Sequence, residues 1–258
     1  MIAYEYIEAS NQNGIGLIEL NRPSQYNALN RKMVREIFCA AQDFDQNAEV
    51  LAIVITGKGR AFSAGADIDE MAEDNPIRLE LLNQFADWDQ LALIKKPLIG
   101  AVKGFVFGGG FELALCCDLL IAAEGTEFSF PEVNLGVMPG AGGTQRLTKI
   151  VGRTKALEWL WTGGRISTAD ALQHGLINRV VMPELLMEET MKTARIIAQQ
   201  APLSIRLIKD SVNKAVDYSL YEGMQFERKN FYLLFSSEDQ KEGMNAFIEK
   251  RKPKFKGR

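Results

Sequence analysis

The chain has 258 residues, 47% hydrophobic and 24% charged, a composition typical of a globular protein and unlike that of disordered or fibrous chains. This length allows one large core with a small appendage. The formal net charge of −3 provides no overall basic field, so the composition argues against a nucleic-acid-binding protein and against attachment to an anionic membrane surface.

Cysteines, the N-terminus and the longest apolar stretch indicate where the protein resides. Cys39, Cys116 and Cys117 offer neither a disulfide framework nor the spacing of metal ligands. The first residues lack the basic and then apolar segments of a signal peptide. Charged residues and glycines interrupt the apolar stretch 98–123, so no membrane span is predicted. We therefore predict a cytoplasmic protein without a metal site.

The first half of the chain alternates strand-length apolar runs with helical patterns, which favours an α/β core. Strands over 4–9 and 16–20 flank Asn13-Gly14, a hairpin turn signal. A helix is expected over 31–45, where apolar residues recur at helical spacing. Buried strands are expected at 51–56, 98–102 and 119–123, and a short extended stretch at 127–131.

The remaining chain is predicted to be helical, with no strand in its C-terminal third. Helices are expected at 143–150, 154–161, 167–174, 184–200, 203–215, 220–235 and 239–250. The last of these can hardly form a large core of their own, so we divide the chain into a core over 1–198 and a helical region over 199–258. We expect this region to bury an apolar cluster against the core or a neighbouring subunit: Phe226, Phe231, Tyr232, Leu233, Leu234 and Phe235.

Several kinds of catalytic site are excluded by what the sequence lacks. His174 is the only histidine, so neither a histidine-based triad nor a multi-histidine metal site can be built, and its place before a glycine indicates a helix end. Gly14-Ile15-Gly16 and Gly140–Gly143 do not complete a dinucleotide fingerprint, and the sequence has no P-loop. No cofactor is predicted.

Three consecutive glycines at a predicted helix start, Gly108 to Gly110, indicate an anion hole. They leave backbone N–H groups accessible at the positive end of the helix dipole. Tight helix packing explains one glycine but explains three poorly.

Glu112 lies three positions after Gly109, on the same helix face, among apolar residues that would make an idle carboxylate costly. The alternative is an exposed glutamate on the helix surface. Glu132 follows a proline, which is also typical of a helix start.

Taken in order, these segments resemble the enoyl-CoA hydratase/isomerase (crotonase) family over nearly the whole chain. The segments that carry the resemblance are Arg60–Ile68, Lys96–Val102, Gly108–Ala114, Pro131-Glu132, Leu135–Thr144 and Ala246–Arg251. The resemblance implies a crotonase-like spiral of ββα units over 1–198. It also implies that 199–258 is a trimerisation region and that the chain self-associates as a trimer or hexamer.

The resemblance also implies a reaction. The N–H groups of Ala66 and Gly109 would form an oxyanion hole for a thioester carbonyl. Glu112 and Glu132 would share the water that adds across the 2,3 double bond of a 2-enoyl-CoA, giving a 3-hydroxyacyl-CoA. Coenzyme A would be part of the substrate. Two close carboxylates titrate as a coupled pair, so their separate acid and base roles stay open at this stage.

The resemblance further suggests residues that bind the substrate. They are Arg60, Ala64, Asp67 and Ile68 along the CoA, Trp88 beside the acyl group, Gly140 near the catalytic water, and Phe247 and Lys250 at the C-terminal end, with Lys250 reaching the CoA phosphates from a neighbouring subunit. Asp69 stands where many relatives carry a lysine, so one phosphate contact is missing. Trp88 and Phe85 also have the spacing of ordinary core aromatics.

Three other functions also fit the same family. Isomerases that move a double bond between positions 3 and 2 typically retain only the carboxylate at the Glu132 position, so the presence of Glu112 favours hydration. A non-enzymatic scaffold would not need both glutamates, and an RNA-binding relative would need a clustered basic face. The natural acyl group, its chain length and any side isomerase activity stay open.

Overall fold

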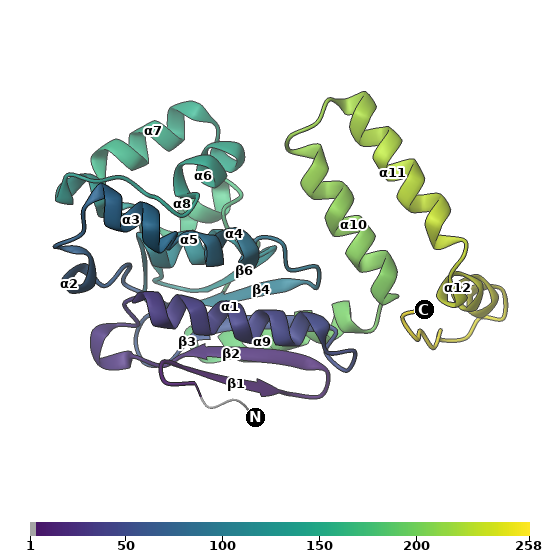
Figure 1. The fold of residues 1–258 in the computed structure, drawn as a ribbon. Helices are drawn as coiled ribbons and strands as arrows, with labels where there is room; N and C mark the ends of the chain where they lie inside the picture. The colour runs from purple at the N-terminus through teal and green to yellow at the C-terminus, as the bar shows by residue number, and fades with distance from the viewer. Residues whose placement is uncertain (1–3) are drawn as a thin grey trace.

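A six-stranded sheet of order β1-β2-β3-β4-β6-β8 lies at the centre of the computed structural model, which describes residues 4–258 (Figure 1). Its strands are β1 (Ile7–Asn11), β2 (Ile15–Leu20), β3 (Ala52–Gly57), β4 (Leu98–Val102), β6 (Leu119–Ala123) and β8 (Arg179–Val181). β1 and β2 form an antiparallel hairpin, whereas the other pairs are parallel. A second parallel pair consists of β5 (Phe105–Phe107) and β7 (Glu127–Ser129).

Helices cover both faces of the central sheet. β3 and β4 are buried at every position, as expected of parallel strands with two covered faces. On one face, Ile53 and Ile55 join a core cluster that includes Met33 of α1 (Arg31–Gln46). On the other face, Val54 joins a second cluster with α9 (Leu186–Ala198). The alternation of side chains along each strand therefore divides the core into two layers.

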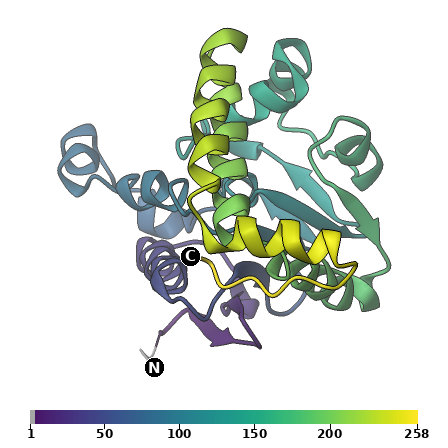
Figure 2. The ribbon, with the colours of Figure 1, turned by 90° about the vertical axis from the view of Figure 1, so that its right-hand side faces the viewer.

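The remaining helices belong to two groups. Within the body these are α2 (Ile68–Met71), α3 (Pro76–Leu82), α4 (Ala86–Leu91), α5 (Gly109–Leu115), α6 (Gly143–Val151), α7 (Arg153–Thr162) and α8 (Thr168–Gln173), with 3-10 helices at Pro23–Gln25, Pro131–Leu135 and Pro183–Leu185. The C-terminal arm, defined as residues 202–258, contains α10 (Pro202–Ala215), α11 (Leu220–Leu234) and α12 (Glu238–Ile248). Figures 1 and 2 show α10 and α11 side by side, with α12 turned across them.

Most predicted elements are confirmed, but one prediction is wrong. The hairpin, α1, the three buried strands and the helices of the arm lie within a few residues of their expected bounds. The C-terminal third is not free of strands, because β8 pairs with β6 at the edge of the sheet. β8 spans only three residues and is half-exposed, so it has too few positions to display a strand pattern.

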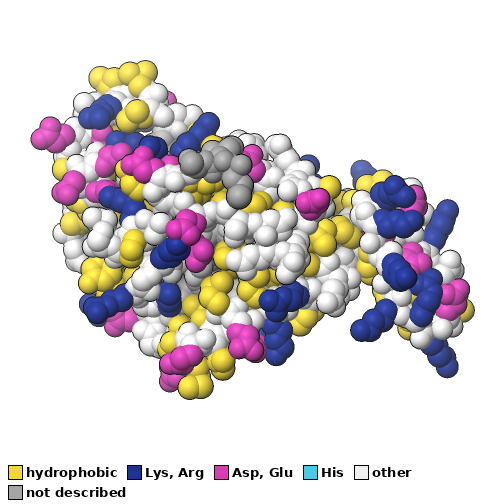
Figure 3. Space-filling view, turned by 90° about the horizontal axis from the view of Figure 1, so that it is seen from below, with side chains coloured by type: hydrophobic (Ala, Val, Ile, Leu, Met, Phe, Trp, Pro, Cys, Tyr) yellow, Lys and Arg dark blue, Asp and Glu magenta, His cyan; other side chains and the backbone are white. Residues whose placement is uncertain are grey.

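The C-terminal arm projects from the body and leaves much of its apolar surface open. Phe231, Tyr232, Leu233 and Phe235 are each between 46% and 67% exposed within the single chain. Seen from below, the far end of the arm forms a separate lobe on which Lys and Arg side chains gather (Figure 3). Part of this charge is balanced, since Arg251 pairs with Glu242 and Glu249 of the same lobe.

No helix between residues 4 and 258 combines the length and the apolar character that crossing a membrane requires. The first three residues, on which the prediction of no signal peptide partly rests, lie outside the described part of the chain.

Candidate active site

Glu112 is a buried carboxylate held by backbone N–H groups. It lies in the first turn of α5, which begins directly after Gly108, and it is 4% exposed. Its Oε1 atom accepts hydrogen bonds from the N–H groups of Ala141 (2.7 Å) and Gly143 (2.8 Å). The alternative of an exposed surface glutamate is therefore wrong. The two donors come from the glycine-rich turn that opens α6, so α5 and α6 position this carboxylate together.

Glu132 approaches the same region from a different element. It lies in the first turn of the 3-10 helix Pro131–Leu135 and is half-buried. A Cβ atom added at Gly108 would lie 3.1 Å from its Oε1. Its Oε2 is shielded from solvent, and no described residue donates a hydrogen bond to it. An oxygen of this kind is free to bind a ligand or a water molecule.

The two carboxyl groups influence each other. Burial raises the pKa of Glu132 to about 7, its own backbone N–H opposes the rise, and the charge of Glu112 adds to it. Burial also raises the pKa of Glu112, while the N–H groups of Gly143 and Ala141 and the charge of Arg146 oppose that rise. Glu112 therefore has more groups that favour its ionised form. Raised carboxyl pKa values in a shared site are typical of groups that transfer protons near neutral pH.

The N–H groups of Ala66 and Gly109 lie next to each other. Leu29 pairs with the strand-like segment at Ala66, accepting from the N–H of Asp67 and donating to the carbonyl of Gly65. Within residues 4–258, neither Ala66 nor Gly109 donates a backbone hydrogen bond to another group. A Cβ atom added at Gly109 would lie 3.6 Å from the amide nitrogen of Ala66. Two backbone N–H groups that lack a hydrogen-bond acceptor therefore lie on neighbouring segments.

This arrangement combines two chemical capacities. Two free N–H groups can stabilise an oxygen that becomes negatively charged, and Gly109 is the first residue of its helix, where the dipole favours an anion. Two carboxyl groups with raised pKa values can accept and donate protons beside it. The rings of Phe111 and Phe130 stack with centroids 4.6 Å apart and contribute an apolar wall.

The residues predicted to bind CoA near Ala66 lie on one stretch of chain. Ala64 is half-buried, Ile68 is 50% exposed at the start of α2, and Arg60 is exposed. Asp67 forms an ion pair with Arg22 at 2.9 Å, so its carboxylate already has a partner within the protein. Arg60, Ala64 and Ile68 are therefore accessible beside the free N–H of Ala66, whereas Asp67 is already engaged.

The aromatic residues before β4 have different environments. Trp88 is 9% exposed and belongs to the main core cluster, as the plain-core interpretation predicted. Phe85 is 39% exposed, and a Cβ atom added at Gly140 would lie 2.8 Å from its Cζ atom. Phe85 therefore covers the turn that carries the donors to Glu112.

Phe247 and Lys250 lie far from the carboxylates within one chain. Phe247 is on α12 and 86% exposed, and Lys250 follows this helix with a positive φ of 55°. Figure 1 shows α12 at the far end of the arm, with α10 and α11 between it and α5. Their predicted contact with the substrate, which for Lys250 would come from a neighbouring subunit, stays a prediction.

Sequence reasoning missed the groups on α6 that surround Glu112. The N–H groups of Ala141 and Gly143 hold its Oε1, and the charge of Arg146 lowers its pKa. The sequence predicts that the glycine-rich segment 140–143 opens a helix, lacks a complete dinucleotide motif and lies near the catalytic water, but this assigns no partner to its N–H groups. Read as a helix start with free N–H groups, it would have indicated a site for a carboxylate.

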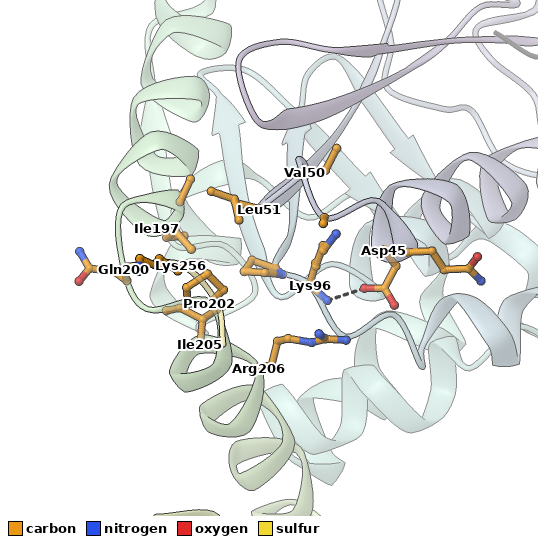
Figure 4. Close-up of a pocket in the computed structure, with 15 residues that line it drawn as sticks. Asp45, Val50, Leu51, Lys96, Ile197, Gln200, Pro202, Ile205, Arg206 and Lys256 are labelled. Atoms are coloured by element: carbon orange, nitrogen blue, oxygen red, sulfur yellow. Dashed lines mark hydrogen bonds between the residues drawn. The ribbon is translucent and has the colours of Figure 1, made fainter. Parts of the chain in front are cut away.

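A cavity of about 230 Å³ lies elsewhere, where the core meets the C-terminal arm (Figure 4). None of the predicted site residues lines it. Its wall includes Lys96, whose backbone N–H donates to Asp45 at 2.9 Å and whose Nζ donates to the carbonyls of Phe44 and Asn47. These contacts fasten the end of α1 to β4, so they are structural.

Comparisons with known proteins place the chain in a family. The family model described as enoyl-CoA hydratase/isomerase matches residues 10–258. A probable enoyl-CoA hydratase of Rhizobium meliloti is 45% identical over 257 residues, covering 100% of both chains. The mitochondrial enoyl-CoA hydratase of Pongo abelii is 45% identical over 256 residues, covering 98% of this chain and 88% of that protein.

Solved structures confirm the predicted fold class. An enoyl-CoA hydratase subunit from Geobacillus kaustophilus HTA426 has a TM-score of 0.97 and 65% sequence identity, with 99% of each chain covered. An enoyl-CoA hydratase from Bacillus anthracis has a TM-score of 0.94 at 34% identity, covering 98% of this chain and 100% of that one. The chain is thus an enzyme with a crotonase-like α/β fold, and it belongs to the enoyl-CoA hydratase/isomerase family.

Proposed function

We propose that this protein is an enoyl-CoA hydratase, which adds water across the 2,3 double bond of a 2-enoyl-CoA thioester to give a 3-hydroxyacyl-CoA. The observation that carries the proposal is that the charge of Glu112 acts on Glu132, whose Oε1 lies against Gly108, next to Gly109 and the amide of Ala66. The names of the relatives support the same reaction.

The N–H groups of Ala66 and Gly109 would bind the thioester carbonyl oxygen. Attack of water on carbon 3 moves negative charge onto this oxygen as an enolate forms. Preorganised donors stabilise this charge, by about 3–4 kcal/mol for each donor in comparable sites. Gly109 suits this role, since it has no side chain to fill the space beside the Ala66 amide.

The two glutamates would transfer the protons of the added water. One carboxylate takes a proton from the water as its oxygen bonds to carbon 3, and the other carboxyl group gives a proton to carbon 2. The surroundings favour Glu112 as the base, because two N–H groups and the charge of Arg146 favour its ionised form. Glu132, whose pKa is raised to about 7, suits the proton donor.

The substrate would be the only source of coenzyme A, and the reaction needs no redox cofactor, because addition of water involves no change of overall oxidation state. Arg60, Ala64 and Ile68 would line the path of the CoA, with Gly140 near the water and Trp88 behind the acyl site. Phe247 and Lys250 would contact CoA across a subunit boundary. The cytoplasmic location stays a prediction.

The isomerase alternative is less well supported. Moving a double bond from position 3 to position 2 requires one group that carries a proton between carbons 2 and 4. A second carboxylate that is 4% exposed and held by two N–H groups has no task in that reaction. Glu112 therefore favours hydration, although its neighbour could support a slow isomerisation.

The direct test is incubation of the purified protein with crotonyl-CoA. We expect the absorbance of the conjugated thioester to fall and mass spectrometry to detect a product heavier by one water, identified as 3-hydroxybutyryl-CoA. A parallel incubation with a 3-enoyl-CoA measures isomerisation. Rapid conversion of the 3-enoyl substrate with no addition of water to crotonyl-CoA would contradict the proposal.

A further inference from the structure

Arg146 is a cation in an unusual position, beside the turn that holds Glu112. It lies on α6, and its side chain folds back over the first turn of that helix, so that a Cβ atom added at Gly142 would lie 3.3 Å from its Nε. This Nε is shielded from solvent and has no hydrogen-bond partner among the described residues. No carboxylate in residues 4–258 lies within 4.0 Å of its guanidinium nitrogens. The side chain as a whole is half-buried, so solvent only partly screens the charge of its guanidinium from the neighbouring turn.

The negative charge in question is the carboxylate of Glu112, which is bound by the same turn. Gly142, against which the arginine folds, stands between Ala141 and Gly143, the two residues whose N–H groups bind Glu112 Oε1. The guanidinium and the carboxylate therefore both pack against one short backbone segment. In agreement with this placement, the charge of Arg146 acts to lower the pKa of Glu112.

We propose that Arg146 is a positioning residue for Glu112, which stiffens the turn 140–143 and supplies the positive charge that faces this carboxylate. The proposal rests on the hydratase function proposed above. The side chain would not touch the substrate, and it would act through the two N–H donors and through its electric field.

Among the described residues, Arg146 is the one cation whose charge acts on Glu112, while Lys209 acts on the neighbouring Cys117. Glu132 faces Glu112 from the 3-10 helix Pro131–Leu135. Cys116 follows Glu112 on α5 and is influenced by Arg146, by Glu112 and by Asp89 of α4. Burial raises the pKa of the Cys116 thiol to about 11, so it stays neutral near pH 7. Removing the cation should therefore leave Glu112 facing negative charges and neutral groups.

The test compares Arg146→Met, which removes the charge, with Arg146→Lys, which retains it. For Arg146→Met we expect kcat at pH 7 to fall about tenfold, with KM nearly unchanged. The acidic limb of the pH profile of kcat/KM should move to higher pH by about one unit, because a nearby opposite charge lowers a carboxyl pKa by that order. Arg146→Lys should keep the limb close to its wild-type position.

Lys149→Met is the matched control, since Lys149 is a cation on the same helix that pairs with Asp217 at the surface. It should leave both kcat and the pH profile unchanged. If Arg146→Met does not fold, Arg146→Gln is measured instead, with the same expected fall in kcat and the same shift of the acidic limb. An acidic limb at the wild-type pH in the uncharged variant would overturn the proposal, as would equal losses in the Lys and Met variants. Absence of hydration in wild type and in Lys149→Met would instead refute the proposed function.

A double-mutant cycle adds a second criterion. If Arg146 acts through Glu112, then Arg146→Met should cost little further activity in a Glu112→Gln background, because the carboxylate it serves is gone. Losses that multiply in the double variant would show that Arg146 acts independently of Glu112 and would overturn the proposal.

Discussion

Glycine has a different role at each of positions 108, 109 and 110. Gly108 adopts a positive φ of 49° and faces Glu132 Oε1. A Cβ atom added at Gly110 would lie 2.6 Å from Ser63, so the close-packing explanation holds for this glycine. At Gly109 the nearest atom would be the Ala66 amide nitrogen at 3.6 Å, an ordinary contact. Among these three positions, only 109 would accept a methyl group without a close contact, and that group would lie beside the free N–H of Ala66.

Gly109→Ala should therefore reduce activity without unfolding the protein. The added methyl group fits sterically but occupies the space in which the thioester oxygen would meet both N–H groups. We expect kcat for hydration of crotonyl-CoA to fall about 100-fold, comparable to the loss of one oxyanion donor. Gly164→Ala is the control, because its Cβ would meet only the side chain of Thr162. Wild-type turnover in Gly109→Ala would show that the oxygen binds elsewhere.

Glu132 should make the stability of the protein depend on pH. Its pKa is about 7 in the folded chain, above the ordinary value of 4.5. The folded state therefore favours the protonated form, and this stabilisation is complete below the unfolded pKa and is lost as pH rises through 7. Glu132→Gln, which carries no charge, should raise the melting temperature relative to wild type at pH 8 more than at pH 5. Calorimetry at both pH values measures this, and a difference that is independent of pH would contradict the assignment.

Among the strands, those with long and continuous apolar patterns could be predicted from the sequence, whereas the shortest ones could not. β3, β4 and β6 are apolar runs bounded by turn residues, so their position in the sheet could be predicted. β5 and β8 have three residues each, too short for a period to appear, and β8 becomes a strand only because it pairs with β6. Tertiary pairing of this kind is absent from local sequence.

In the candidate site, too, local sequence predicts one part and tertiary contacts determine the rest. Glu112 could be singled out because its neighbours are apolar and glycines precede it on one helix. Its N–H donors come from residues 29 and 31 positions later, and no local pattern specifies that contact. The ion pair that engages Asp67 likewise joins residues far apart in sequence, 22 and 67. Sequence thus identified the carboxylates, whereas the fold determined which groups surround them.

Lys96 links α1 to the central sheet, and this link can be tested. Its side chain is 8% exposed, and its Nζ donates to the carbonyls of Phe44 and Asn47, both at 2.6 Å, at the end of α1. A cation at this end also interacts favourably with the helix dipole. Lys96→Met leaves both carbonyls without this donor, so we expect the free energy of unfolding to fall by about 1–3 kcal/mol.

Lys95→Met is the control for this experiment, because Lys95 is the adjacent residue and is exposed. Its free energy of unfolding should match that of wild type in denaturant titrations. Equal stabilities for the two variants would mean that the Lys96 contacts at the end of α1 contribute nothing measurable.

The whole molecule consists of a body and a projecting C-terminal arm. The arm extends from the body and presents apolar side chains from three helices to solvent, including Leu220 at 82% and Phe247 at 86% exposure. Exposed apolar surface on this scale is typical of an interface. It supports the predicted trimer or hexamer, in which residues 199–258 would pack against a neighbouring subunit.

Light scattering during size-exclusion chromatography tests this prediction. We expect a particle whose mass is three or six times that of the 28.8 kDa chain. Replacing Phe231 and Tyr232 together by serine should shift the population toward smaller particles, because it removes apolar area from the proposed interface. A wild-type protein that elutes as a monomer over a wide concentration range would contradict the predicted assembly.

The central claim is that Glu112 and Glu132 act together on one water molecule, and single amide substitutions test it most directly. Glu112→Gln and Glu132→Gln keep the shape of each side chain but remove its ability to take up a proton. We expect each to lower kcat on crotonyl-CoA by roughly 100-fold or more, while circular dichroism stays that of wild type. Near-normal turnover in either variant would contradict the account.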